Sequence, residues 1–170
     1  MLAATFRIAS AAFALALAPV PLQAVQPLVP AARPNEGLAV VPLSVTTRTG
    51  THRYRVEVAK SALEQQIGMM YRTDVPRGTG MLFPYDPPRP AAFWMENTFV
   101  GLDIIFIAPD GRVSDISARA VPMSRDLHQS SGKVKAVLEL AAGEAERIGL
   151  RVGDRVAWES HALGNGKRGR

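Results

Sequence analysis

Short runs of alternating apolar and polar residues, separated by turn signals, recur along most of the chain. In "RYRVEVA", Tyr54, Val56 and Val58 alternate with charged residues, and this period of two is typical of a half-buried strand. Turns are indicated at Thr49-Gly50 and at Asp110-Gly111. Parallel strands need long crossovers, usually helical, and the sequence contains only short helical signals. We therefore expect a mainly β fold, an antiparallel β-sandwich or barrel-like domain with two short helices.

Both expected helices have recognisable ends. In "SALEQQIG", Ser61 and Glu64 have the spacing of a capping box, and Gly68 is a typical helix terminator. The second helix, "GEAERIG", is expected to end at Gly149.

Two apolar segments indicate strands with particular positions in the fold. "LDIIFI", Leu102–Ile107, is expected to be the most buried strand, and the following "RVSDIS" should return antiparallel to it. "MLFPY" is interrupted by Pro84, which has no N–H to donate, so we expect Pro84 at a sheet edge or a bend.

The first 24 residues have the order of a secretory signal. Arg7 precedes an apolar run, Ile8–Ala18, and the small residue Ala24 stands before the expected cleavage site. The run is much shorter than the roughly 20 residues that span a bilayer as a helix. We therefore expect a periplasmic or secreted protein cleaved near Ala24, with no transmembrane span after cleavage. An uncleaved N-terminal anchor is the alternative.

Composition divides the rest of the chain into three parts. Residues 25–41 are rich in proline and are expected to form an extended linker. Residues 42–159 carry the strand and helix signals and form the expected β-rich domain. Residues 160–170 are rich in glycine and basic residues, which predicts a flexible tail.

Charge and residue types exclude several classes of function. The formal net charge is +5, but Lys167, Arg168 and Arg170 lie in the tail, whereas a nucleic-acid-binding domain needs a basic stripe on its folded face. We therefore expect no nucleic-acid partner. The chain has no cysteine, which excludes disulfides, thiolate metal sites and cysteine nucleophiles.

Recognisable cofactor and catalytic motifs are missing from the sequence. The three histidines, His52, His128 and His161, do not have the short spacing of metal ligands. There is no nucleophile elbow, phosphate loop or dinucleotide fingerprint. We expect neither a metal nor another cofactor.

Six segments, taken in order, resemble one family of proteins. They are "GMMYR" (68–72), "GMLF" (80–83), "FWMENT" (93–98), "LDIIFI" (102–107), "VLELAAG" (137–143) and "GLRVGDRV" (149–156). Their order and spacing are similar to those of the domain of unknown function 192 family, from about Val56 to Trp158. The resemblance implies a compact, β-rich, sandwich-like fold, often behind a signal peptide, and it implies no established activity.

Two positions depart from the family pattern. Glu96 stands where the family usually has a basic residue, and Gly101 stands where it usually has proline. If that basic residue binds an anion in the family, the same anion would meet the opposite charge in this chain.

The segment "FWMENT" joins three large apolar residues to three polar ones. In a strand, Phe93 and Met95 would share one face, so we expect both in the core. Trp94 would lie on the other face, as a wall of the fold or as the floor of a cleft. Asn97 and Thr98 suit a bulge or turn, or hydrogen bonding to a ligand beside the tryptophan.

Arg72 and Asp103 are the other candidate polar residues. Asp103 lies within a very apolar strand, where an ionised carboxylate needs hydrogen bonds or a cation. A charge pair with Arg72 would satisfy it. A position at the mouth of a pocket or on the surface is the alternative.

These observations favour binding over catalysis. The leading hypothesis is an exported binding or accessory module of the cell envelope, with a small-molecule cleft formed by Arg72, Trp94, Asn97, Thr98 and Asp103. Sugars or envelope fragments would be suitable ligands. One alternative is a hydrolase that uses Asp103 or Glu96 as general base. Another is a scaffold whose exposed edge binds a second protein.

Export can be tested directly. We expect the protein recovered from the cell envelope to begin near Val25, because the apolar run and Ala24 match a cleaved signal. N-terminal sequencing of the envelope fraction checks this start. Recovery of a chain with intact Met1 from the cytoplasm would contradict export.

Overall fold

The computed structural model describes residues 33–159. The predicted signal (1–24), the first part of the predicted linker (25–32) and the basic tail (160–170) lie outside the described residues. No helix in the described part is long and apolar enough to cross a membrane.

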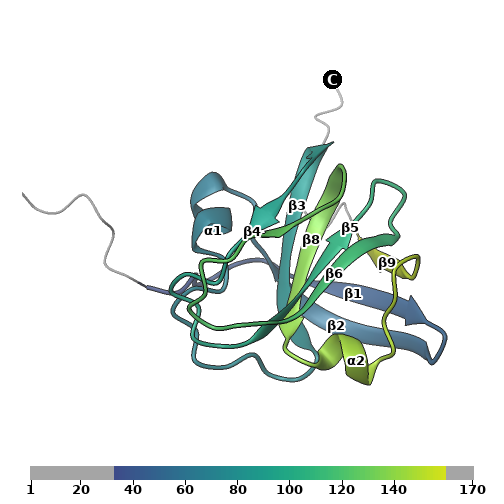
Figure 1. Ribbon diagram of the computed structural model, residues 1–170, viewed down its shortest axis with the longest axis horizontal. Helices are drawn as coiled ribbons and strands as arrows, with labels where there is room; N and C mark the ends of the chain where they lie inside the picture. The colour runs from purple at the N-terminus through teal and green to yellow at the C-terminus, as the bar shows by residue number, and fades with distance from the viewer. Residues whose placement is uncertain (1–32, 160–170) are drawn as a thin grey trace, which may run out of the picture. The chain divides into compact units, whose positions relative to one another are not determined.

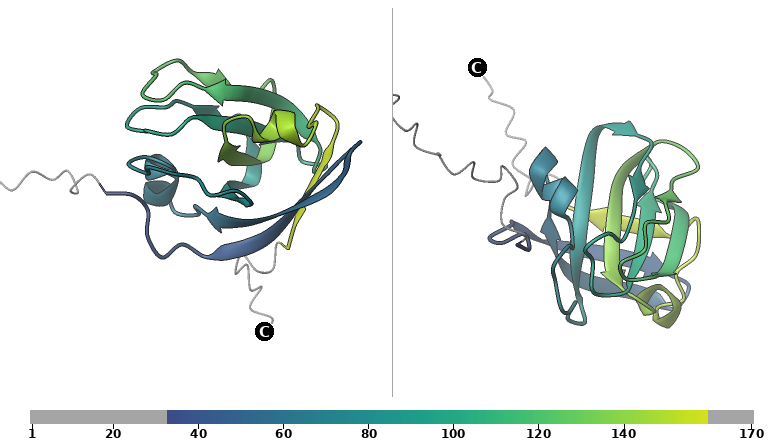
Figure 2. Two further views of the ribbon diagram at one scale, coloured as in Figure 1. Left: turned by 90° about the horizontal axis from the view of Figure 1, so that it is seen from below. Right: turned by 60° about the vertical axis from the view of Figure 1, so that its left-hand side comes forward.

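Seven strands form one sheet in the order β6-β5-β8-β3-β2-β1-β9, and the sheet curls into a half-barrel (Figures 1 and 2). Strands β4 and β7 form a separate two-stranded sheet. The strands are β1 (Val40–Thr47), β2 (Gly50–Val58), β3 (Thr79–Arg89), β4 (Ala92–Phe93), β5 (Leu102–Ile107), β6 (Val113–Ala120), β7 (His128–Gln129), β8 (Val134–Ala141) and β9 (Arg155–Trp158). The helices are α1 (Ala62–Ile67) and α2 (Glu144–Arg147). The predicted mainly β, barrel-like fold with two short helices is confirmed.

One pair of neighbouring strands departs from the antiparallel arrangement. Residues Arg55–Val58 of β2 run parallel to Thr79–Leu82 of β3, whereas the other neighbours in the large sheet are antiparallel. The segment between β2 and β3 contains α1 and a loop, and it is long enough for the crossover that a parallel pair requires. The short helix signal therefore belongs to a crossover that the sequence pattern did not predict.

The local predictions for α1 and the first hairpin are largely correct. Ser61 Oγ accepts a hydrogen bond from the Glu64 N–H at 3.2 Å, and Glu64 Oε2 accepts one from the Ser61 N–H at 2.8 Å, so the capping box is present. The helix ends at Gly68, which has a φ of +49°. The hairpin turn lies one residue earlier than predicted, at Arg48-Thr49, and Gly50 begins β2.

Pro84 lies inside the sheet, next to an irregularity in the strand register. Strand β3 lies between β8 and β2, but its pairing with β2 ends at Leu82. Pro84 pairs with Ala136 of β8, and the register shifts between Pro84 and Arg89. The missing N–H of proline is therefore accommodated where the ladder is already interrupted.

The described end of the predicted linker is packed against the domain. Asn35 is buried, and its Nδ2 donates to the carbonyl oxygens of Glu64 at 2.9 Å and Gly68 at 3.1 Å. Leu38 packs against buried apolar residues, and β1 already starts at Val40. The folded domain thus begins before Pro42, because an amide side chain ties this segment to the C-terminal end of α1.

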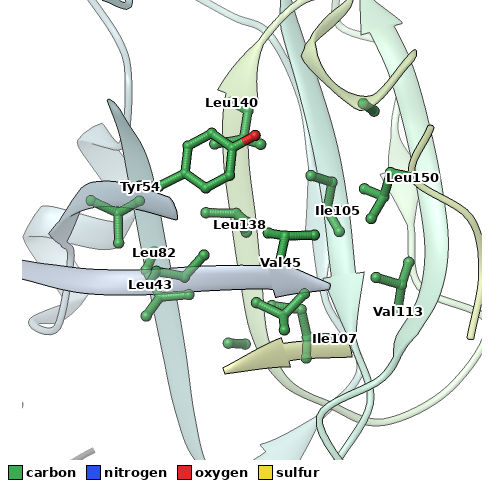
Figure 3. Packing of buried hydrophobic residues seen from close by; sticks show 14 of the residues in the cluster. Leu43, Val45, Tyr54, Leu82, Ile105, Ile107, Val113, Leu138, Leu140 and Leu150 are labelled. Atoms are coloured by element: carbon green, nitrogen blue, oxygen red, sulfur yellow. The ribbon is translucent and has the colours of Figure 1, made fainter. Parts of the chain in front are cut away.

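Two hydrophobic clusters cover the two faces of the central strands. The inner cluster lies inside the curled sheet, where Val45 of β1 packs with Ile105 and Leu138 (Figure 3). The outer cluster lies on the opposite face and includes Met81 and Phe83. All six residues of β5 are buried, as predicted for this strand, because both of its faces are covered.

Gly80 allows β3 and β8 to pack closely. A Cβ at this position would lie 2.4 Å from the carbonyl oxygen of Glu139 and 2.7 Å from Leu140 Cδ2. We expect Gly80→Ala to lower the free energy of unfolding by about 1–3 kcal/mol, because backbone atoms must move to make room. Gly132→Ala is the matched control, since a Cβ there meets nothing within 4 Å. Its effect should stay within about 0.5 kcal/mol in urea denaturation, and equal stability of the two variants would contradict the prediction.

Candidate functional site

A cleft of about 320 Å³ lies between the outer face of the sheet and the segments that cover it. Glu139 of β8 and Phe83 of β3 line it from the sheet. Helix α1 and residues 68–70 line a second side, and Phe93, Trp94 and Thr98 line a third. Figure 1 shows α1 and β4 beside β3, where these segments meet. The cleft therefore combines a floor on the sheet with walls on a helix and loops.

Glu139 reaches the cleft because of the alternation of β8. Leu138 and Leu140 point into the inner cluster, so Glu139 lies on the outer face. It pairs with Met81 on one side and with Ile104 on the other, and both of these residues are apolar and buried. Only 3% of Glu139 is exposed. A carboxyl group is thus placed in an apolar row at the centre of the sheet.

The carboxyl group of Glu139 has no protein partner among the described residues. Its Oε2 is buried and makes no hydrogen bond, and no ion pair forms at this side chain. Burial raises the pKa of Glu139 to about 8, although the positive charge of Arg72 opposes the shift. The group is therefore largely protonated at neutral pH.

Arg72 pairs with Glu57, and the predicted Arg72–Asp103 pair is wrong. Arg72 Nη1 lies 2.6 Å from Glu57 Oε2, and Nη2 donates to the Asn35 carbonyl at 3.1 Å. The Nε of Arg72 is buried without a hydrogen bond. Arg72 does not line the cleft but acts on Glu139 through its charge. The correct partner lies on β2, which pairs with β3 only because of the unpredicted parallel crossover.

Asp103 is satisfied by backbone N–H groups. Its side chain is fully buried, Oδ1 accepts from the Arg119 N–H at 2.8 Å, and Oδ2 accepts from the Ala145 N–H at 2.7 Å. These bonds connect β5 to β6 and to the start of α2. Asp103 does not line the cleft.

The "FWMENT" segment forms one wall of the cleft and part of its rim. Met95 is fully buried, and Phe93 packs edge-on against Phe83, with ring centroids 4.9 Å apart. The prediction of a core position is confirmed for Met95, whereas Phe93 is only partly buried, packs against the outer cluster and lines the cleft. Trp94 lines the cleft with 46% of its surface exposed, and Thr98 lines it while buried. The segment therefore contributes both to the core and to the cleft.

Asn97 lies in a turn and outside the cleft. It has a φ of +55°, and its carbonyl accepts a hydrogen bond from the Tyr71 N–H at 2.8 Å. The neighbouring Glu96 pairs with Arg125 at 2.6 Å. The acidic residue that departs from the family pattern thus connects the turn to the loop that precedes β7.

A cation and a phenol lie together at another part of the cleft. The guanidinium carbon of Arg89 lies 4.4 Å from the ring centroid of Tyr85, and Nη2 donates to Gln65 Oε1 at 3.2 Å. Burial raises the pKa of Tyr85 to about 12, so its hydroxyl group stays neutral. Within residues 33–159, no group of three or more histidine, aspartate or glutamate side chains is placed to hold a metal ion.

Of the five candidates from the sequence, Trp94 and Thr98 line the cleft, whereas Arg72, Asn97 and Asp103 do not. Glu139 was missed, although it carried the same signal as Asp103, a single acidic residue in an apolar strand. Four of the six family-like segments contribute residues that line the cleft. One of these four also contains Arg72, whose charge acts on Glu139.

The raised pKa predicts a pH-dependent stability that Glu139→Gln should remove. Below about pH 4 both the folded and unfolded states hold the proton. Between about pH 4 and about pH 8 the Glu139 carboxyl keeps its proton only in the folded state. Unfolding therefore releases a proton, and the free energy of unfolding falls as the pH rises. The slope from this one group can reach about 1.4 kcal/mol per pH unit.

The matched control is Glu36→Gln, a change at an exposed residue. The free energy of unfolding is measured by urea denaturation at about pH 5 and about pH 8. The difference between Glu139→Gln and wild type should change in favour of Glu139→Gln at the higher pH. Glu36→Gln should follow wild type at both. A constant difference between wild type and Glu139→Gln would contradict the prediction.

Comparison with known proteins places the fold in one family. The DUF192 family, described as an uncharacterised ACR, matches residues 44–158. A protein of unknown function from Novosphingobium aromaticivorans DSM 12444 is 44% identical, over 76% of this chain and 93% of that chain, with a TM-score of 0.71. A candidate transcription regulator from Sinorhizobium meliloti 1021 is 38% identical, over 73% of this chain and 97% of that chain, with a TM-score of 0.70. No curated protein matches. The resemblance seen in the sequence is confirmed, and the chain belongs to the uncharacterised DUF192 family.

Proposed function

We propose that this protein is an exported binding or accessory module of the cell envelope and that the cleft beside Trp94 holds a small molecule. The observation that carries the proposal is the buried carboxyl of Glu139, which faces the cleft and has no partner within residues 33–159. Leaving a buried polar group unpaired costs about 1–3 kcal/mol. A ligand that bonds to this group would offset that cost. Export is supported by the signal-like order of the first 24 residues.

The lining of the cleft supports a small-molecule ligand. Its volume of about 320 Å³ lies at the lower end of the range of ligand pockets, roughly 300–1,000 Å³. Rings from Phe83, Phe93 and Trp94 supply apolar surface, and polar side chains such as Gln65, Arg89 and Glu139 form a comparable part of the lining. Aromatic surface together with polar groups that fix orientation is typical of small-molecule sites.

The residues proposed for a hydrolase do not favour that alternative. Both carboxylate oxygens of Asp103 already accept backbone hydrogen bonds, and the side chain is fully buried. Glu96 is paired with Arg125 and does not line the cleft. A general base needs to reach the proton that it removes, and neither carboxylate lies where a ligand of the cleft could meet it.

One observation favours the protein-interaction alternative. Phe99, Val121, Met123 and Leu127 are exposed apolar residues on two loops. The loops are joined by backbone hydrogen bonds, from the Met123 N–H to the Thr98 carbonyl and from the Met95 N–H to the Ser124 carbonyl. These residues lie outside the cleft lining, so substitutions can separate the two functions.

The binding proposal is tested by ligand retention. Native mass spectrometry of protein purified from the envelope should show a small molecule bound to wild type and lost from Trp94→Ala. Leu63→Ala is the control, because Leu63 is exposed on α1 and does not line the cleft. Both variants should keep their stability within about 0.5–1 kcal/mol. Equal ligand retention in Trp94→Ala and wild type, or no bound molecule in any sample, would contradict the proposal.

A further inference from the structure

We infer that the ligand of the cleft is an organic cation: a small molecule with an ammonium or amidinium group and a flat apolar body. The inference rests on the proposed binding function and adds the chemical class of the ligand. It depends on which charges of the cleft are already paired within the protein and which are not.

The sheet side of the cleft offers an acceptor without a donor. Glu139 has no hydrogen bond or ion pair within the described residues. The nearby cation, Arg72, binds Glu57 and the Asn35 carbonyl through its two Nη atoms, and its Nε is buried without a hydrogen bond among the described residues. Arg72 does not line the cleft and makes no ion pair with Glu139. An ionised carboxylate accepts several hydrogen bonds, and an ammonium or amidinium group supplies donors together with the opposite charge. A cationic head is therefore the group that completes this end of the cleft.

The walls of the cleft are suited to the same charge. Phe83, Phe93, Trp94 and Tyr85 contribute aromatic rings, whose faces attract cations. The ring of Tyr85 is already occupied in this way by Arg89, at 4.4 Å, so the rings that remain for a ligand are those of Phe83, Phe93 and Trp94. Among these aromatic residues Trp94 is the exposed one, so its ring is accessible to the apolar body of a ligand.

An anionic ligand would meet less favourable groups. Arg89 is the only cationic side chain in the described lining, and it is exposed and bonded to Gln65. Water screens an exposed charge, so its repulsion of a cation and its attraction for an anion are both weak. A carboxylate ligand would also need Glu139 to keep its proton.

Proton release distinguishes a cationic ligand from a neutral one. The titratable groups that face Glu139 are Arg72 and Tyr85, and Arg89 lies further along the lining. The other elements around it present uncharged residues, Ile104 from β5 and Thr98 from the loop after β4. A bound cation favours the ionised carboxylate, so its binding must release a proton below about pH 8. Its affinity should rise with pH, whereas a neutral acceptor would bind better to the protonated form.

Three probes that share a benzene ring distinguish a cationic, a neutral and an anionic ligand: benzylammonium, benzyl alcohol and benzoate. Calorimetric titration of the intact chain should show benzylammonium binding at least about tenfold tighter than the other two. Between about pH 6 and about pH 8 its affinity should increase. Titrations in buffers of different ionisation enthalpy should detect the released proton.

Glu139→Gln should remove the preference for benzylammonium and the proton release. Retained binding of benzyl alcohol to this variant would show that its cleft is still folded, and Leu63→Ala should behave as wild type. Equal or tighter binding of benzyl alcohol or benzoate to wild type would overturn the cationic class and leave the binding proposal standing. If none of the three probes binds wild type, the cationic class is overturned, and the ligand-retention experiment decides the binding proposal separately.

Discussion

The pairing of β8 between β3 and β5 is the constraint on which the core and the cleft both depend. Successive residues of β8 point to opposite faces, so this register sends Leu138 and Leu140 into the inner cluster and Glu139 to the outer face. A shift of one residue would exchange the faces and place a carboxyl group inside the half-barrel. Gly80 permits the close approach of β3 to β8 at this level of the sheet. The same geometry therefore packs the core and positions the unpaired acid.

Much of the fold could be predicted from local patterns. The capping box of α1, the buried character of β5 and the return of β6 all depend on residues close together in sequence, and the structure contains each of them. The parallel pairing of β2 with β3 could not be predicted in this way. A six-residue helix and a loop give no periodic signal strong enough to mark a crossover.

The site was less predictable because it depends on contacts between distant segments. Arg72 could be recognised as a cation in need of a partner, but the choice of Glu57 over Asp103 follows from which strand lies beside β3. Trp94 and Thr98 could be singled out because three large apolar residues run directly into three polar ones in "FWMENT", which is unusual for a plain strand. Glu139 has a similar local signal to Asp103, and the partners of the two residues differ only in the folded chain.

The two buried acids, Asp103 and Glu139, differ in their hydrogen-bond partners. Asp103 receives two backbone N–H groups, and its role in joining β5 to β6 and α2 is complete within the protein. Glu139 is equally central and almost equally buried, yet it receives no hydrogen bond from the part of the chain that the structure describes. Packing alone would be served as well by an apolar residue between Met81 and Ile104.

The remaining parts of the cleft are arranged differently from its floor. Glu139 is fixed by a strand at the centre of the sheet, whereas Trp94 and Thr98 lie on a segment held to a second loop by two backbone hydrogen bonds and by the Glu96–Arg125 pair. The Glu96–Arg125 pair contributes little to stability, about 0–1 kcal/mol, so the segment is held mainly by its backbone hydrogen bonds and by the buried Met95. The floor would then determine the charge of the ligand, and the rim would determine the shape of its body.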